Sequence, residues 1–460
     1  MKNKTKWVFW GFFSLDYKAM ETYLEEMAEK GWMLREVGRY IAKFRAIEPQ
    51  NIKFYVDVFK EGGPLTPEKT EDSEEYRELC LESGWTFITS QDYLQFFYAD
   101  GDTEPVPIQT DEEIEQKIVE HTLFRNELRG ILIFSLIAAY IFIKNSPIRY
   151  SSLLSFTGVT STLLFPILYI FAAGSATYSI IRILKARSNI KKGFPIEKPT
   201  MKSARRRIII LYGSTWIILL LLVLSFIADA FFMPDIVLFA LLGPGVGAII
   251  GIGSRYYIKK KATKKEDGIL VIVFAVILPI IFINTIGPFI MERSEDIYKV
   301  DSVPEGYPII TLKEITKESS EGSVNMEFKP GKSPIVPKHY TFWESENING
   351  NKKSMSIKYY KSINSYFAEV IFNGITERLE KGMKWRGMTI FTKKIITDDE
   401  MKNLWDVDNM ALTDKRGEII IQKGNIVLHL NDFSGDIDFN DRQKRELIIS
   451  RFFSDSSFEN

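Results

Sequence analysis

Five apolar runs between residues 128 and 291 limit what this chain can fold into more than any other feature of the sequence. A helix needs about 20 predominantly apolar residues to cross a bilayer, and three of the runs have that length. A fourth run is longer and contains Pro166, and the first run is barely long enough. The sequence therefore predicts an all-α transmembrane bundle of five helices, with spans at about residues 128–143, 156–182, 208–227, 236–258 and 268–291.

Lysine and arginine in the connecting segments predict the orientation, because cytoplasmic loops of membrane proteins carry an excess of these residues. Basic residues crowd segments 185–207 and 259–267, whereas segment 144–152 has few and segment 228–235 has none. With five spans, the N-terminus is cytoplasmic and the C-terminus is extracytoplasmic. We therefore expect a multi-pass protein of the cell membrane that has the lipid bilayer as a partner.

The composition gives no support for nucleic-acid binding, since the formal net charge of the 460-residue chain is +0. The mean hydropathy of -0.05 averages an apolar middle and two polar flanks. Cys80 is the single cysteine, so an intramolecular disulfide is excluded. Each flanking domain must therefore be stabilised by a hydrophobic core of its own.

An internal repeat organises the N-terminal flank, residues 1–105. The sequence YLEEMAEKGW ends at Trp32, and the similar sequence YRELCLESGW ends at Trp85. Each copy begins with an aromatic, β-branched run that is typical of a strand, and an amphipathic helical pattern follows. Two further strands close each copy. We predict a tandem β-α-β-β domain of α+β class, with an antiparallel sheet and its helices on one face.

Four residues mark this structural repeat. Gly31 and Gly84 lie where a helix C-terminal cap needs a positive φ angle, which glycine adopts without a Cβ clash. Trp32 and Trp85 follow them. We interpret both tryptophans as core residues that fix a helix end to the sheet, rather than as residues that stack on a ligand. Cys80 is similarly interpreted as a buried, unreactive thiol.

These residues resemble a known family. The order of an aromatic strand, LEEMAEKGW, a hairpin, the strand KFYVDVF, a second helix that ends on GW, and the strand YLQFFYAD is similar to bacterial proteins that carry domain of unknown function 2812. The resemblance covers about residues 5–100, and the following multi-span region is also similar. It implies a bacterial cell-membrane protein, often associated with transcriptional regulators of the PadR type. It implies no catalytic residue.

Between the N-terminal domain and the first apolar run, residues 106–127 are predicted to form a linker and a connector helix. Within the membrane region, residues 128–291, small residues are expected to let helices pack closely. The candidates for helix packing are Gly243, Gly247, Gly251 and Asn284. A broken-helix binding site around Pro244 is the alternative interpretation.

The C-terminal flank, residues 292–460, is predicted to be an extracytoplasmic α+β domain. Up to about residue 350 the chain is polar and punctuated by proline and glycine. An amphipathic helix that ends at Gly382, a second helix that begins at a capping box in residues 397–400, a hairpin around Gly424 and a final helix at 441–453 follow. Asp438 and its neighbours depart from the pattern of a calcium loop, so they are interpreted as a strand end and a helix cap.

No catalytic, cofactor-binding or metal-binding residue is predicted, because no triad, carboxylate pair or phosphate loop is present in the sequence. We expect an integral membrane protein that is a non-enzymatic regulator or sensor, linking a cytoplasmic and an exterior domain. The alternative is an accessory or core subunit of a transporter or channel. A protein partner or a second copy of the chain is expected to bind through the membrane region, and nucleic acid is not expected as a partner.

Overall fold

The computed structural model describes most of the two flanks and parts of the region between them. The described residues are 4–38, 40–64, 66–100, 149–192, 200–233, 245–262, 265–318, 323–348, 350–385, 388–390, 392–397, 399–413, 417–435 and 437–454, with isolated positions between 105 and 143. The chain divides into two compact units. Unit 1 comprises residues 1–142, 167–220 and 242–283, and unit 2 comprises residues 143–166, 221–241 and 284–460.

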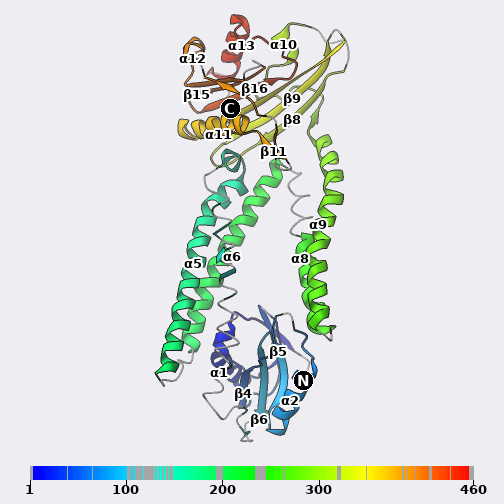
Figure 1. The fold of residues 1–460 in the computed structure, drawn as a ribbon, viewed down its shortest axis with the longest axis vertical. Helices are drawn as coiled ribbons and strands as arrows, with labels where there is room; N and C mark the ends of the chain where they lie inside the picture. The colour runs from blue at the N-terminus through cyan, green and yellow to red at the C-terminus, as the bar shows by residue number, and fades with distance from the viewer. Residues whose placement is uncertain are drawn as a thin grey trace. The chain divides into compact units, whose positions relative to one another are not determined.

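The N-terminal domain, which belongs to unit 1, contains the order β-α-β-β twice, as the repeat predicted (Figure 1). A short 3-10 turn precedes the first helix. The first copy consists of β1 (Thr5–Phe9), α1 (Tyr17–Glu29), β2 (Trp32–Val37) and β3 (Ile41–Ala46), and the second of β4 (Ile52–Val58), α2 (Glu71–Glu82), β5 (Thr86–Gln91) and β6 (Leu94–Asp100).

Each copy forms its own three-stranded antiparallel sheet with the same strand order. The first sheet is ordered β1-β3-β2 and the second β4-β6-β5. The two hairpins share an irregularity, because the register shifts between Leu34 and Glu36 in β2 and between Phe87 and Thr89 in β5. The extra residues of these two β-bulges are Arg35 and Ile88, which occupy equivalent places in the repeat.

The core of the domain shows that the two helices do not share one sheet face. The larger cluster is enclosed by α1, by the first sheet and by one face of the second sheet, with Leu24, Phe44 and Phe96 fully buried. A smaller cluster, with Cys80 and Phe97, lies between α2 and the other face of the second sheet. The predicted single sheet with both helices on one face is therefore wrong, because the second sheet is covered on both of its faces.

Helices follow in the middle of the chain. They are α5 (Phe156–Lys191), α6 (Met201–Phe232), α8 (Val246–Lys260) and α9 (Lys265–Glu295). Both α5 and α6 contribute residues to unit 1 and to unit 2. Of the predicted spans, residues 128–143 lie mostly outside the described residues. Spans 156–182, 208–227 and 268–291 lie within α5, α6 and α9, and span 236–258 overlaps α8 in part.

The predicted five-helix transmembrane bundle is contradicted. Among the described residues, no helix combines the length and the apolar character that crossing a membrane requires. The fourth predicted run illustrates the reason, because its described helix, α8, has 15 residues and ends on Lys259 and Lys260. The helix α6 starts well before its apolar run and includes the charged Lys202 and Arg205.

The C-terminal part of unit 2 is built on one antiparallel sheet. Its eight strands are ordered β13-β14-β15-β16-β10-β9-β8-β7. These strands are β7 (Lys299–Val300), β8 (Asn325–Gly331), β9 (Lys338–Ile348), β10 (Asn351–Lys361), β13 (Ile395–Ile396), β14 (Asn409–Thr413), β15 (Glu418–Lys423) and β16 (Ile426–Asp432). A separate hairpin joins β11 (Met383–Trp385) to β12 (Met388–Ile390).

Helices cover both faces of the eight-stranded sheet (Figure 1). One face packs against α10 (Leu312–Thr316), α12 (Asp399–Trp405) and α13 (Arg442–Phe452), around the fully buried Trp405. The other face packs against α11 (Ser365–Lys381) and a 3-10 turn (Tyr150–Leu154) that precedes α5. Alternate side chains of β15 and β16 point into the two clusters, which is why both strands are buried along their length.

Several predicted elements of this domain are confirmed. The helix α11 ends at Gly382, the β15–β16 hairpin turns at Gly424 with a φ of 58°, and Asp441 caps α13 by accepting hydrogen bonds from the next turn. The stretch up to residue 350, predicted only as polar and punctuated by proline and glycine, contains β8, β9 and a helix that begins at Leu312.

Candidate functional site

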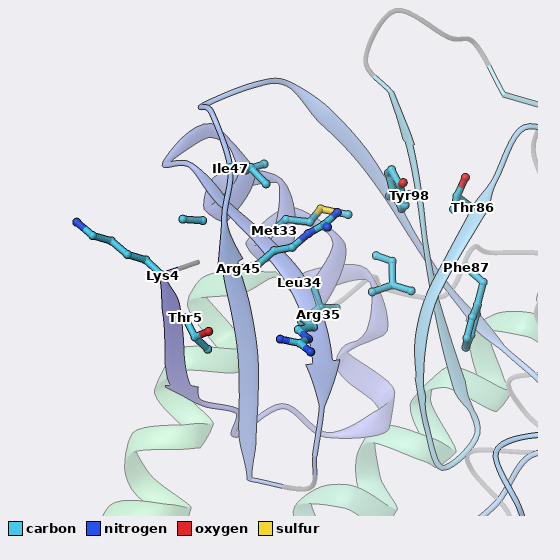
Figure 2. Close-up of a pocket in the computed structure, with 12 residues that line it drawn as sticks. Lys4, Thr5, Met33, Leu34, Arg35, Arg45, Ile47, Thr86, Phe87 and Tyr98 are labelled. Atoms are coloured by element: carbon cyan, nitrogen blue, oxygen red, sulfur yellow. The ribbon is translucent and has the colours of Figure 1, made fainter. Parts of the chain in front are cut away.

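The edges of the two repeat sheets approach one another and leave an open cleft. Strands β2 and β5 are both edge strands, and neither hydrogen-bonds to the other. A cavity of about 610 Å³ lies there, lined by Lys4, Thr5, Met33, Leu34, Arg35, Arg45, Ala46, Ile47, Thr86, Phe87, Ile88 and Tyr98 (Figure 2). We call this cavity the inter-repeat cleft. It is the strongest candidate for a binding site among the described residues, since both copies build it from strands rather than loops.

Equivalent positions of the two copies line the inter-repeat cleft. In the alignment that matches Trp32 with Trp85, the first copy supplies Met33, Leu34, Arg35 and Arg45, and the second supplies Thr86, Phe87, Ile88 and Tyr98. The two bulge residues, Arg35 and Ile88, form one of these pairs of equivalent positions. The cleft therefore lies between equivalent parts of the two repeats, and these two parts differ in chemical character.

The first copy makes one side of the cleft cationic. Lys4, Arg35 and Arg45 are exposed there, and no aspartate or glutamate is among the lining residues. Within the described chain none of these three cations forms an ion pair. Figure 2 shows the side chain of Arg45 extending across the sheet beside Met33, toward the side on which Tyr98 and Thr86 lie.

The second copy makes the other side apolar and hydroxyl-bearing. Phe87 and Ile88 are half-buried, and Thr86 and Tyr98 present hydroxyl groups that can donate or accept. The ring of Phe87 packs on the α2 face of the second sheet, beside Phe97, where the guanidinium carbon of Arg77 lies 3.8 Å from its centre. Arg77 is itself held by Gln95, whose Oε1 lies 3.0 Å from the Arg77 Nε.

A second cavity extends the cleft toward helix α8. This cavity, of about 520 Å³, shares Arg35 and Ile88 with the inter-repeat cleft and also contacts Tyr256, Lys260 and Lys261. A ligand at the bulge residues would therefore lie beside the C-terminal end of α8, within the same unit of the structure.

The end of α8 is held to the N-terminal domain by ion pairs, which we call the α8 contact. Asp92 Oδ1 lies 3.4 Å from Arg255 and 3.6 Å from Lys259, and Glu68 accepts a hydrogen bond of 2.5 Å from Lys260. Lys259 also donates to the carbonyl of Gly63. Burial lowers the pKa of Lys259, and the neighbouring Asp92 offsets part of that effect. These contacts give the lysines of the predicted basic loop a structural role in unit 1.

The structure places the four repeat residues at the two helix ends. Gly31 has a φ of 82° and Gly84 a φ of 91°, and each lies two residues after the last residue of its helix. Trp85 is buried and donates from Nε1 to the carbonyl of Val106 at 2.8 Å. Trp32 is half-buried beside the main core, where Lys6 lies over its ring. Neither tryptophan lines the inter-repeat cleft.

The predicted helix-packing residues are not brought together. Gly243 lies outside the described residues. A Cβ atom placed on Gly247 or Gly251 would meet no described atom within 4 Å, so neither glycine permits a close helix contact within this part of the chain. Asn284 is exposed on α9. Packing between two copies through these residues stays a prediction.

Titratable groups of unit 2 form a second buried cluster. His429 Nε2 lies 2.6 Å from Glu418 Oε1, and Lys393 pairs with the same carboxylate. Burial lowers the pKa of His429, while hydrogen bonds from His429 and Lys393 hold the pKa of Glu418 below its usual value against the effect of burial. His339 bonds the carbonyl of Leu154 at 2.7 Å. These groups satisfy one another and serve the packing of the sheet against its neighbours.

Sequence reasoning missed the cleft residues, of which Arg35 and Arg45 are the most informative. Each is a charged residue within a strand, and by itself that pattern indicates only a solvent-exposed face. The usable signal was the repeat, because aligning the copies shows basic residues in one copy opposite apolar or aromatic residues in the other.

Comparison with known proteins bears on the N-terminal domain. Residues 16–126 match the family model described as "Protein of unknown function (DUF2812)". The chain thus carries domain of unknown function 2812 in this stretch, which confirms the resemblance of the N-terminal domain to it. No curated protein and no solved structure matches the chain.

Proposed function

We propose that the protein is a non-enzymatic regulator or sensor, in which the N-terminal domain binds a ligand and unit 2 responds. The observation that supports this proposal is the helix α6, which has residues in both units. At its start, Ala204 is fully buried in the main core of the N-terminal domain, and Ile208 packs against the same cluster. A helix is a stiff element, so a shift at one end is transmitted along its axis.

The other end of α6 fixes a helix terminus in unit 2. Asp229, which is buried, accepts hydrogen bonds from the backbone nitrogens of Phe156 at 2.6 Å and Thr157 at 2.8 Å. The carboxylate thus satisfies donors at the start of α5 and interacts favourably with the positive end of its dipole.

The turn before α5 is bonded in turn to the eight-stranded sheet. Ser333 donates to the carbonyl of Leu153, which is buried in the cluster below α11. Motion of α6 at Asp229 would therefore reach the sheet through two backbone attachments, at Leu153 and at Leu154. Such coupling requires two states that differ in ligand affinity.

Hydrogen exchange on the full chain tests the proposal. Ala204→Leu adds volume to a packed core and should displace the start of α6. We expect faster exchange at the amides of Phe156 and Thr157 in this variant. Arg206→Leu introduces the same side chain at an exposed position of the same helix and should leave those amides unchanged. Ala204→Val repeats the test with less added volume, in case the leucine variant does not fold.

A response confined to the N-terminal domain in both Ala204 variants would contradict the proposal. The same result in Arg206→Leu and Ala204→Leu would also contradict it, because the effect would then not depend on the buried position. The opposite direction is measurable too, by following the amide of Ile208 in Asp229→Asn.

We further propose that the protein is located at a membrane, with lipid as the contact of its exposed apolar side chains. Trp216 and Leu220 on α6 are 59% and 58% exposed, and Leu278 on α9 is 51% exposed. Acyl chains would remove this surface from water, at about 25 cal/mol per Å². Cell fractionation tests the location: we expect recovery with membranes and release by detergent but not by salt. Recovery in the soluble fraction would reject it.

A further inference from the structure

We propose that the inter-repeat cleft binds an organic anion, a carboxylate or phosphate group carried on an apolar or aromatic body. This inference rests on the proposed sensor function and names the ligand class of its site. The proposal is based on the division of the cleft into a cationic half from the first copy and an apolar, hydroxyl-bearing half from the second.

The cationic half favours an anion because its charges are not neutralised from within the described chain. Arg35 and Arg45 lie on neighbouring strands that pair antiparallel, and Lys4 immediately precedes β1 on the far side of β3. Guanidinium groups present donors in a planar fork that matches carboxylate and phosphate oxygens. With no lining carboxylate to oppose them, the three cations give the cleft a positive potential that attracts anions and repels amines.

The other half of the cleft favours an apolar body next to the charged group. The half-buried side chains of Ile88 and Tyr98 provide a surface on which an aromatic ring or aliphatic chain can pack. The hydroxyls of Thr86 and Tyr98, which also line the cleft, can donate hydrogen bonds to a ligand. A free inorganic anion would use only part of this surface, whereas a ligand with both parts would use all of it.

The asymmetry between the copies is what distinguishes a site from an incidental gap. A seam that only joined two repeats could carry the same residue types on both sides. Here Arg45 stands where the second copy has Tyr98, and Arg35 stands where it has Ile88. Both differences between the copies place charge on one side of the cleft and apolar surface on the other, which is the pattern of a site that orients an amphipathic ligand.

Ligand binding at the bulge would also act on the α8 contact. Arg35 and Ile88 line both the inter-repeat cleft and the cavity that contains Lys260. Lys260 pairs closely with Glu68 and lies 3.9 Å from Glu36. An anion at Arg35 competes with these carboxylates for the lysine, so occupancy of the cleft is expected to loosen the end of α8.

Titration of the full chain with named probes tests the ligand class. The probes are phenyl phosphate, phenylacetate, inorganic phosphate and benzylamine, and binding is followed by chemical shifts or calorimetry. We expect phenyl phosphate or phenylacetate to bind at least about tenfold more tightly than inorganic phosphate, and benzylamine not to bind. Because each arginine is expected to make charge-assisted hydrogen bonds to the anion, Arg35→Ala and Arg45→Ala should each weaken the affinity for phenyl phosphate or phenylacetate by about tenfold or more.

Matched variants assign the binding to the cleft. Lys53→Ala removes an exposed cation from β4, outside the cleft, and should leave the affinity unchanged. Arg45→Lys keeps the charge without the planar fork and should fall between the native protein and Arg45→Ala. Binding that is equal for benzylamine and phenylacetate, equal for inorganic and phenyl phosphate, or equally weakened by Lys53→Ala would overturn the inference, as would no binding by either organic anion.

The same titration separates this inference from the proposed function. If phenyl phosphate binds with the expected dependence on Arg45 but hydrogen exchange in unit 2 is unchanged, the site stands and the sensor function fails. If no organic anion binds, while Ala204→Leu still alters exchange at Phe156, the coupling stands and the ligand class is wrong.

Discussion

At the scale of single residues, the repeat positions differ in how far the sequence could predict them. Gly31 and Gly84 were predictable because a helix end that needs a positive φ is a local property of the chain. The environments of Trp32 and Trp85 were less predictable. Only Trp85 finds an acceptor for its Nε1, at Val106, and only it is fully enclosed. That difference depends on residues distant in sequence.

Substitution of the two tryptophans separates their roles. Trp85→Ala should destabilise the N-terminal domain by about 3–5 kcal/mol, since a large buried side chain and its hydrogen bond are both lost. Trp32→Ala should cost clearly less, because Trp32 is only half-buried. Denaturant unfolding of the full chain, followed by a probe in the N-terminal domain, measures both. Equal losses in the two variants would show that burial does not decide their contributions.

Glu344 is a residue whose protonation should affect unit 2. Burial raises its pKa to about 7, against a hydrogen bond from the backbone nitrogen of Leu312, and Glu346 raises it further. A carboxyl with a raised pKa in the folded state binds more protons there than when unfolded. Stability is therefore greatest below the ordinary pKa of 4.5 and falls as the pH rises toward about 7.

Glu344→Gln tests this pH dependence while keeping an acceptor for the amide of Leu312. We expect the variant to gain up to about 3 kcal/mol in the free energy of unfolding at pH 8 relative to the native protein, and much less at pH 5. Thermal unfolding at both pH values measures the difference. A gain of equal size at the two pH values would mean that the charge of Glu344 is not the cause.

At the scale of elements, the edge of strand β4 shows how a helix can protect a sheet. The carboxylate of Glu21 on α1 accepts a hydrogen bond of 2.9 Å from the backbone nitrogen of Val56, and Glu25 accepts one from Phe54. Burial raises the pKa of both glutamates. Free edge donors of this kind otherwise offer a pairing site to another strand.

Removing these carboxylates should expose that edge. Glu21→Ala is expected to cost about 1–3 kcal/mol, because the amide of Val56 loses its acceptor in a buried setting. The double variant Glu21→Ala with Glu25→Ala should also self-associate in sedimentation or light-scattering measurements. Glu29→Ala, on the last turn of α1, is the matched control and should remain as soluble as the native protein. Unchanged association in the double variant would contradict the protective role.

Strand β9 explains why part of the C-terminal fold was not predictable. Its residues Glu344, Ser345 and Glu346 are buried, and in the sequence such a polar run is typical of a loop. These side chains find a buried environment only after the neighbouring strands and α10 are in place. The β15–β16 hairpin, by contrast, was predictable from apolar residues on both sides of Gly424.

At the scale of the whole molecule, three ion pairs join α8 to the N-terminal domain. The three ion pairs of the α8 contact are partly exposed, and each is expected to contribute no more than about 1 kcal/mol. Predicted apolar spans gave no indication of this contact, because Asp92 and Lys259 are far apart in the sequence. Salt should therefore weaken it strongly.

Raising the salt concentration tests the α8 contact in the intact protein. At 1 M salt the Debye length is about 3 Å, so we expect faster hydrogen exchange in the last turn of α8. Asp92→Asn should give a similar increase at low salt and little further response to salt. Asp72→Asn, an exposed aspartate on α2, is the control and should keep the native salt response. An α8 end insensitive to salt would show that apolar packing holds it.

The position of the inter-repeat cleft at the seam of a duplication has a consequence for how this protein can change over time. Each wall belongs to a different copy, so a substitution at Arg45 alters the cationic wall and leaves the apolar wall at Ile88 intact. Mutation can therefore adjust the charge of the accepted ligand and the shape of its body separately. Proteins built on the same repeat could then share one architecture while responding to chemically different signals.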